Sequence, residues 1–222
     1  MFGVTTTLDL DAGLIELSAR GGGAASLPLG ARDKLVSYIE LLAKWNRTYN
    51  LTAIREPERM VTHHVLDALA VLPHLSGETE RPGLRVLDVG SGGGVPAIPL
   101  AIARPSWHVV ALDSSHKKGA FLQQAVIELS LPNAEAVIAR VEDYAPSAPF
   151  DVVISRAFSD LATFAATSAR HLAPGGRLVA MKGVFPDEEV ALLPPPFRVV
   201  AAPALAVPGL DAERHLIVME RA

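Results

Sequence analysis

The stretch RVLDVGSGGGVPAIPLAIARP, from Arg85 to Pro105, passes from an apolar run into a cluster of glycines and then into an apolar, Ala- and Pro-rich segment. Glycine at this density weakens a regular helix or strand, because it costs backbone entropy. A chain that places it directly after a predicted strand needs its main chain to turn tightly or to lie very close to a ligand. The stretch therefore predicts a strand, a binding loop and a helix.

Outward from this unit toward the C-terminus, strand and helix patterns alternate. This alternation predicts right-handed βαβ units and a mostly parallel, doubly wound sheet. Helices are expected at residues 96–105, 116–130 and 161–173. Seven strands are expected, at residues 85–89, 108–113, 134–141, 150–158, 177–183, 197–203 and 214–220.

Toward the N-terminus the pattern is helical. A short helix is expected around residues 8–18, followed by a Gly/Ala/Ser linker over residues 19–30. Apolar residues at helical spacing then predict helices over residues 31–51 and 56–75. We therefore expect an N-terminal segment and helical cap over residues 1–83, and an α/β domain over residues 84–222.

Composition limits the class of protein. Hydrophobic residues make up 50% of the 222 residues and charged residues 20%, which is compatible with a well-packed core. The chain has no cysteine, which excludes disulfides, cysteine zinc sites and cysteine nucleophiles. No secretory signal or membrane-spanning run is recognisable, so we expect a cytoplasmic protein with no membrane partner. The net charge of −4 leaves room for a local basic patch that binds nucleic acid.

The spacing of the glycines bears on the ligand, which in such sheets binds at the carboxyl ends of the strands. A dinucleotide fingerprint needs a third glycine at position 95, where the chain has Val95. The observed Gly90-x-Gly92-x-Gly94 is typical of loops that bind S-adenosylmethionine, and Asp88 is expected to attract the amino group or sulfonium of that ligand. A tight turn that binds nothing stays open as an alternative.

A second acid, Asp113, ends the next predicted strand about 20 residues after the loop. An acid at this position accepts hydrogen bonds from ribose hydroxyls, which favours an adenosine-type ligand without separating the two cofactor types. Asp113 could instead cap the following helix, or serve in both roles.

Several blocks of the chain resemble one known family, the bacterial small-subunit rRNA guanine-N7 methyltransferases called RsmG or glucose-inhibited division protein B. The similarity covers roughly residues 34–183, and Ala97 is a departure where the family often has glycine. The most specific blocks are NLTAIR…HHVLDAL and VISRAF. In family order the blocks are NLTAIREPERMVTHHVLDALAVLP, LDVGSGGGVPAIPLAIARP, LDSSHKKGAFLQ, ARVEDY, DVVISRAF and LAPGGRLVAMKG.

The resemblance implies a class I S-adenosylmethionine-dependent methyltransferase, with a Rossmann-like, seven-stranded, mostly parallel sheet. It implies S-adenosylmethionine as methyl donor, S-adenosylhomocysteine as product, and N7 of one guanine in the decoding-region loop of 16S rRNA as acceptor. The partner would be small-subunit rRNA or the ribosomal small subunit. Residue by residue, it implies cofactor contacts at Gly90 and Val95 and, near the adenine, at Val141 and Glu142. Arg156 would be a further cofactor contact, facing the methyl-transfer site.

Methylation of guanine N7 requires few catalytic groups from the protein. Guanine N7 has an in-plane lone pair and no proton at neutral pH, so no general base is needed. After the fourth predicted strand the chain has Ser155-Arg156-Ala157-Phe158 rather than the Asn/Asp-Pro-Pro-aromatic motif common in amino-group methyltransferases. We therefore expect catalysis mainly by proximity and in-line orientation, with no acid or base residue.

Basic residues are expected near the ligand edge of the sheet. Arg156 could hydrogen-bond guanine O6 or a phosphate, and Phe158 could stack on a base or simply pack in the core. Arg140 and Lys182 follow other predicted strands, so they should lie on the same edge; a solvated surface is the alternative for each lysine. Further candidates for RNA contact are Lys117, Lys118, Lys44, Arg47 and Arg55.

His63, His64 and Asp67 invite comparison with a metal site. Adjacent histidines point to different faces of a helix and no third ligand is evident, so we expect no metal. We expect instead that one histidine packs under the glycine loop or lines the RNA side, with Asp67 as its hydrogen-bond partner. Asn50 and Thr52 are expected to cap or end a helix, with an RNA or cofactor contact by Asn50 as an alternative.

Other functions stay open from the residues alone. They are a methyltransferase acting on another RNA, a protein or a small molecule, an NAD-type Rossmann oxidoreductase, and a non-catalytic adenosine-binding regulator. We expect a monomer.

Overall fold

A computed structural model describes residues 4–20, 27–75, 81–156 and 158–221. Its seven strands form one sheet in the order β3-β2-β1-β4-β5-β7-β6. Among these strands only β7 runs in the opposite direction to the other six, which confirms the predicted seven-stranded, mostly parallel sheet. The strands are β1 (Arg85–Val89), β2 (His108–Asp113), β3 (Ala134–Ile138), β4 (Phe150–Ser155), β5 (Leu172–Lys182), β6 (Phe197–Ala201) and β7 (His215–Arg221).

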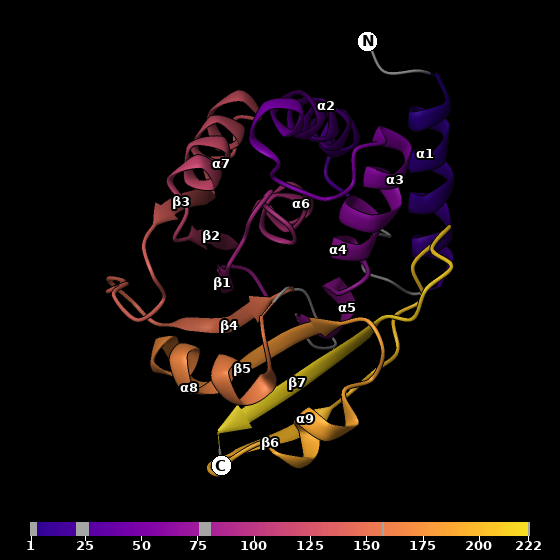
Figure 1. Ribbon diagram of the computed structural model, residues 1–222. Coiled ribbons are helices and arrows are strands. Elements are labelled where there is room, and N and C mark those ends of the chain that lie inside the picture. Colours follow the sequence, from indigo (N-terminus) through magenta and orange to yellow (C-terminus); the bar gives the residue numbers. More distant parts are fainter. Residues whose placement is uncertain (1–3, 21–26, 76–80, 157, 222) are drawn as a thin grey trace.

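Helices cover both faces of this sheet (Figure 1). On one face lie α2 (Ala31–Tyr49), α6 (Ala97–Ala103) and α7 (His116–Glu128). On the other lie α8 (Leu161–Ser168) and α9 (Asp187–Ala191), and the 3₁₀ turn η3 (Ala169–His171) directly follows α8 in the chain. The predicted doubly wound arrangement is therefore confirmed.

The first third of the described chain is helical, as predicted. It contains α1 (Val4–Ala19), α2, α3 (Pro57–Met60), the π-helical turn η2 (Val61–Leu66), α4 (Asp67–Leu69) and α5 (Leu72–Leu75). Residues 21–26 of the expected linker lie outside the described residues. One hydrophobic cluster contains residues from α1, α2 and α6, so the cap shares a core with the sheet. The division of the chain at residue 83 stays a prediction.

Two predicted elements differ in detail. The helix expected over residues 56–75 is divided, with a π-helical turn at Val61–Leu66. The helix expected over 161–173 gives way to β5 at Leu172, so Pro174, Gly175 and Gly176 lie inside a strand rather than in a turn before it. A register shift opposite Phe150 and Val152 accommodates this segment, because an irregular pair tolerates a proline that donates no ladder hydrogen bond.

The central strands are buried on both faces, which explains their nearly continuous apolar sequence. Along β1, Val86 packs into the cluster shared with the cap and α6, whereas Leu87 packs into the cluster beneath α8. Side chains alternate between the two faces of a strand, so the two clusters together fix the register of β1. The loop after β1 is thereby held at the carboxyl edge of the sheet.

Candidate functional site

The glycine loop joins β1 to α6 and is tied to the end of the neighbouring strand. The amides of Gly90 and Ser91 both donate to the Leu112 carbonyl of β2, at 2.9 and 3.0 Å. Gly90, Gly92 and Gly94 have φ angles of 75°, 58° and 83°, a region that side-chain-bearing residues rarely adopt. The loop is therefore a fixed turn that needs glycine for its conformation.

The glycines serve two different purposes. A Cβ built on Gly90 meets no atom within 4 Å, so this residue faces open space. A Cβ on Gly94 would lie 2.5 Å from Ile98 Cγ1, and one on Gly93 would lie 3.0 Å from Leu42 Cδ1. Gly90 thus leaves room on the outside of the loop, while Gly93 and Gly94 let α2 and α6 pack closely against its inside.

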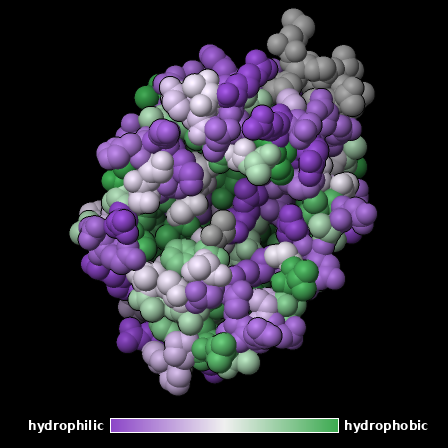
Figure 2. Space-filling view, in the orientation of Figure 1, coloured by the Kyte–Doolittle hydropathy of each residue, from purple (hydrophilic) through white to green (hydrophobic). Residues whose placement is uncertain are grey.

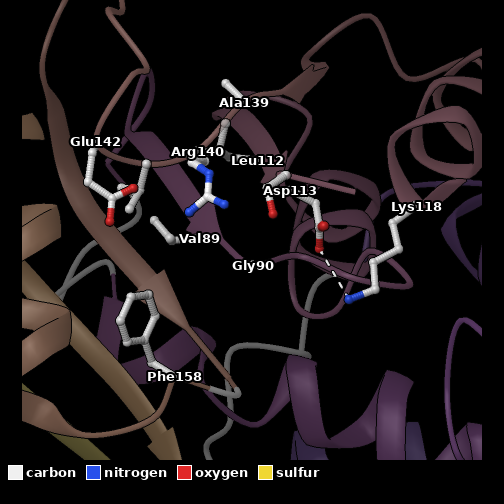
Figure 3. A pocket seen from close by; sticks show the side chains of 11 residues that line it. Val89, Gly90, Leu112, Asp113, Lys118, Ala139, Arg140, Glu142 and Phe158 are labelled. Carbon is white, nitrogen blue, oxygen red and sulfur yellow. Dashed lines mark ion pairs between the residues drawn. The ribbon is translucent and has the colours of Figure 1, made fainter. Parts of the chain in front are cut away.

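The open space beside Gly90 belongs to a cavity of about 320 Å³, which we call the cofactor cavity. Glu142 and Phe158 lie on one side of it, and Asp113 and Lys118 on the other (Figure 3). Figure 2 shows a hollow across the middle of the molecule with both hydrophilic and hydrophobic residues around it. The cavity is lined by Val89, Gly90, Leu112, Asp113, Ser114, Lys118, Ala139, Arg140, Val141, Glu142 and Phe158.

Asp113 lies in this cavity with its carboxylate already engaged. Oδ1 accepts from the Ser115 amide at 2.8 Å, and Oδ2 accepts from the Gly92 amide at 2.9 Å. Lys118 Nζ lies 3.6 Å from Oδ2. Asp113 therefore ties the glycine loop to the start of α7, and carboxylate lone pairs beyond these bonds can still accept from a ligand.

Asp88 does not lie in the cavity. It is fully buried under the loop, where Oδ2 accepts from Ser91 Oγ at 2.6 Å and from the Ala97 amide at 3.1 Å. Burial raises the pKa of Asp88 to about 6, while the bonds from Ser91 and Ala97 act to lower it. The expectation that this carboxylate faces the ligand is corrected, because its bonded oxygen holds the loop and the start of α6 together.

Three other loop residues expected at the cofactor, Gly92, Gly94 and Val95, also lie away from the cavity lining. Val95 is buried, and its amide donates to the Ser91 carbonyl at 3.1 Å. Gly92 presents its amide to Asp113. None of the three residues lines the cavity, so they act here on the shape of the loop.

The segment after β3 forms the opposite wall. The amides of Asp143 and Tyr144 both donate to the Arg140 carbonyl at 3.1 Å, which closes a turn. His171 Nε2 lies 2.9 Å from the Val141 carbonyl, and Arg170 donates to the Glu142 carbonyl at 2.6 Å. These contacts fix the Val141 and Glu142 carbonyls in place. The exposed side chains of Arg140 and Glu142 border the cavity (Figure 3).

Phe158 packs against the core, as one of its two alternatives predicted, and it also borders the cavity; stacking on a base stays a prediction. Its ring lines the cofactor cavity, and it also packs against Phe164 of α8 with ring centroids 5.2 Å apart. Packing from behind fixes the ring while leaving part of it accessible.

Arg156, which was expected beside the cofactor, does not line the cofactor cavity but a second cavity of about 270 Å³, which we call the arginine cavity. Its Nη1 donates to the His63 carbonyl at 2.7 Å and lies 3.5 Å from Asp67 Oδ2. Arg214, which the sequence reasoning missed, donates through Nε to Asp67 Oδ1 at 3.1 Å. The arginine cavity is lined by Asp67, Arg156, Met181, Lys182, Gly183 and Arg214.

His64 is buried but is not paired with Asp67, which corrects that expectation. Its Nε2 lies 2.9 Å from Thr52 Oγ1 and its Nδ1 lies 3.2 Å from Arg156 Nη1. Burial, assisted by the charge of Arg156, lowers the pKa of His64 to about 3, so the ring is neutral at physiological pH. Burial raises the pKa of Asp67, while Arg156 and Arg214 act to lower it.

The loop before α3 was only partly anticipated. Asn50 ends α2 with φ 50°, as expected of a left-handed cap. Thr52 instead contacts His64, and its amide donates to Asn46 Oδ1 at 2.9 Å. Asn46, which also donates to the Ile54 carbonyl at 3.0 Å, therefore organises this loop.

The basic residues do not all form one surface. Lys182 Nζ is held by both oxygens of Glu189 at 2.8 and 3.0 Å, so it is not the unpaired phosphate contact that was expected. Lys117 is exposed at the start of α7, and Lys44 is exposed on α2. Arg47 and Arg55 line a separate cavity of about 250 Å³ on the cap with Asn46 and Asn50.

The described residues offer neither a metal site nor a membrane-spanning helix. They contain no cluster of three or more His, Asp or Glu side chains placed to hold a metal ion. None of the described helices combines the length and apolarity needed to cross a membrane.

Solved structures with similar folds define the class. The fold matches TrmN from Thermus thermophilus with a TM-score of 0.54 at 23% identity, over 73% of this chain and 53% of that one. It matches the glycopeptide N-methyltransferase MtfA, complexed with S-adenosyl-L-methionine, with a TM-score of 0.59 at 16% identity, over 72% of this chain and 96% of that one. The fold is that of the class I, Rossmann-like methyltransferases.

Sequence comparison narrows the class to a family. The family described as rRNA small subunit methyltransferase G (GidB) matches residues 31–217, and the chain belongs to it. Ribosomal RNA small subunit methyltransferase G of Laribacter hongkongensis is 54% identical over 94% of this chain and 95% of the relative. The protein of the same name from Chromobacterium violaceum is 52% identical over 96% of this chain and 97% of the relative.

Proposed function

We propose that this protein is an S-adenosylmethionine-dependent methyltransferase that modifies N7 of one guanine in the decoding-region loop of 16S rRNA. The observation that carries the proposal is the position of Gly90, whose missing side chain leaves the cofactor cavity open at the carboxyl edge of β1. Membership of the rRNA small subunit methyltransferase G family over residues 31–217 supports the choice of substrate.

The cavity residues fit S-adenosylmethionine, which supplies an electrophilic methyl group when bound. Gly90 lets the main chain lie against the ligand, because any larger residue would extend into the cavity. Asp113 is placed at the end of β2 to accept hydrogen bonds from ribose hydroxyls. Val141 and Glu142 border the part of the cavity that we assign to the adenine. Asp88, Gly92, Gly94 and Val95 act by holding the loop in shape.

Methyl transfer to guanine N7 needs no acid–base catalysis from the residues at the edge of the sheet. Guanine N7 carries a lone pair and no proton at neutral pH, so the chain needs only to hold the purine in line with the methyl group. Arg156 follows β4 and lines the arginine cavity, where it can donate hydrogen bonds to guanine O6 or to phosphate. Phe158 is placed to stack on a base displaced from the RNA, with Phe164 behind it.

The RNA partner is a large anion, and several basic side chains surround the two cavities. Arg140 and Lys117 are exposed at the carboxyl edge of β3 and at the start of α7, where they can contact phosphates. Lys118 also forms an ion pair with Asp113. Arg47 and Arg55 offer a second basic site on the cap. We propose that the enzyme acts as a monomer in the cytoplasm on rRNA or on the small subunit.

The test is to incubate the protein with donor labelled in its methyl group and with small subunits or stripped 16S rRNA from cells that lack the enzyme. We expect the label on N7 of a single guanine. Label on another atom, or on another RNA only, would contradict the proposed acceptor.

Binding measurements test the cofactor separately. We expect S-adenosylmethionine to bind and NAD not to bind, since Val95 occupies the third position of the dinucleotide fingerprint. NAD binding without S-adenosylmethionine binding would instead support an oxidoreductase.

A further inference from the structure

Arg214 enters the arginine cavity from the far end of the chain, just before β7. Its Nε donates to Asp67 Oδ1, and its Nη1 donates to the Glu213 carbonyl at 2.8 Å. About a fifth of its side chain remains exposed, at 22%. The guanidinium is therefore held in place yet reachable from solvent.

Arg156 is held from the cap by an irregular helical turn. In an α-helix the Asp67 amide would donate to the His63 carbonyl, but here it donates to the carbonyls of His64 and Thr62. Arg156 Nη1 donates to the His63 carbonyl instead. The π turn thus leaves the His63 carbonyl available to accept from Arg156. It also places the Asp67 carboxylate between Arg156 and Arg214.

The charges in the arginine cavity do not cancel. Lys182 is neutralised by Glu189 at 2.8 Å, and the single carboxylate of Asp67 faces two guanidinium groups. One positive charge is left over. Among the described residues, Arg156 commits only Nη1 and Arg214 commits Nε and Nη1, so each guanidinium keeps N–H groups that can donate to an anion.

The two cavities are joined by the chain that follows β4. Ser155 Oγ donates to the Val89 carbonyl at 2.7 Å, which fixes the end of β4 beside the glycine loop. Arg156 then lines the arginine cavity, and Phe158 lines the cofactor cavity. A nucleotide whose base approaches the methyl group from this side would bring its backbone near Arg156 and Arg214.

We propose that the arginine cavity receives one phosphate of the rRNA backbone beside the acceptor guanine, and that Arg214 is a phosphate contact. Asp67 is a positioning residue, which holds Arg156 and Arg214 side by side. A phosphate suits the surplus positive charge better than the neutral guanine ring does. The inference rests on the proposed rRNA substrate and names a part of its binding site.

The main test compares Arg214→Gln with the wild-type protein in binding to unmodified 16S rRNA at several salt concentrations. Loss of one phosphate contact should reduce the slope of log K against log[salt] by about 0.7–0.9. We expect affinity for the RNA to fall by about tenfold, because a charge-assisted hydrogen bond is lost. Affinity for S-adenosylmethionine should stay unchanged.

Two matched variants make the result specific. Arg214→Lys keeps the charge and should keep the wild-type slope. Arg198→Gln removes an arginine that also faces a carboxylate, Glu220 at 3.9 Å, on the distant strand β6, and should leave slope and turnover unchanged. A wild-type slope in Arg214→Gln overturns the inference while leaving the proposed function intact. A wild-type protein that methylates neither rRNA nor small subunits contradicts the proposed function itself.

Asp67→Asn tests the positioning role, with thermal unfolding measured alongside to confirm that the variant folds. Both guanidinium charges remain, so RNA affinity should not weaken, but kcat should fall by about tenfold because the arginines lose their common anchor. An unchanged kcat, or a weaker RNA affinity as the sole effect, would contradict this role.

Discussion

The cofactor cavity and the arginine cavity lie side by side at the carboxyl edge of the sheet but are built in different ways. The first depends on main chain: a loop, two strand ends and a turn, with Gly90 leaving the space open. The second depends on charged side chains that are far apart in sequence, since Asp67 and Arg214 are 147 residues apart. A site built from main chain can be predicted from a short sequence pattern. A site built from distant charged side chains forms only when the fold brings those side chains together.

The largest effect that separates the two cavities is expected from Gly90→Val. A valine at φ 75° is strained, and its side chain would occupy the cofactor cavity. We expect S-adenosylmethionine binding to fall by at least about 100-fold, which corresponds to about 2.7 kcal/mol. Calorimetric titration measures this. RNA binding should persist, and tight cofactor binding by the variant would show that the ligand does not lie against the loop.

Arg156→Ala breaks the arginine cavity instead. We expect turnover on rRNA to fall by about 100-fold, because the acceptor loses a group that orients it. Stability should fall by about 1–3 kcal/mol, since Asp67 stays buried with one arginine fewer. Single-turnover kinetics and urea unfolding measure the two effects. Unchanged turnover would remove Arg156 from the site.

The sequence was informative where the physics is local. Seven apolar strand runs, the glycine spacing and Asp113 at the end of β2 all follow from patterns a few residues long, and the structure has them in the expected places. The family resemblance drew attention to Arg156, and family membership is confirmed.

The sequence was less informative about which charged side chains would form ion pairs or hydrogen bonds with each other. Nothing near Lys182 shows that Glu189 will neutralise it, and nothing near Asp67 points to Arg214. Asp88 was expected to attract the amino group or sulfonium of the ligand, yet the alternation of β1 turns it under the loop. Side-chain pairing depends on distances across the fold that sequence patterns do not contain.

Gly94→Ala sharpens the difference between the outside and the inside of the glycine loop. The added methyl would clash with Ile98 and Leu122, in addition to the strain at φ 83°. Gly83→Ala is the matched control, because Gly83 has φ 77° and nothing within 4 Å of its Cβ position. We expect Gly94→Ala to be less stable than this control by about 1–3 kcal/mol in urea unfolding. Equal stabilities would mean that the inner side of the loop is not tightly packed.

A smaller, pH-dependent effect is expected next to the arginine cavity. The unfolded chain binds a proton at His64 near pH 6.5, whereas the folded chain does so only near pH 3, so stability falls as the pH decreases between these values. From about pH 7.5 to about pH 5.5 the free energy of unfolding should fall by about 1.4 kcal/mol for this reason. His64→Gln should lose that part of the pH dependence, and the exposed His116→Gln should keep it. Urea unfolding at the two pH values decides the matter; identical pH dependence in all three proteins would contradict a buried neutral His64.

The smallest effect concerns the link between the cap and the cofactor cavity. Tyr38 of α2 is fully buried and donates from its hydroxyl to the Gly93 carbonyl, so the glycine loop beside the cofactor cavity is held from the cap. Tyr38→Phe leaves that carbonyl without this donor and should cost about 0.5–1.5 kcal/mol of stability. Because the loop loses its support, S-adenosylmethionine should also bind less tightly, by a factor below about ten. Tyr49→Phe, on the same helix but 44% exposed, should change neither quantity. Tyr38→Phe could lose stability with no change in affinity for S-adenosylmethionine. The cap would then support the fold of the loop and not its binding geometry. The two cavities, which are both anchored on the cap, would be less closely coupled than this shared anchorage suggests.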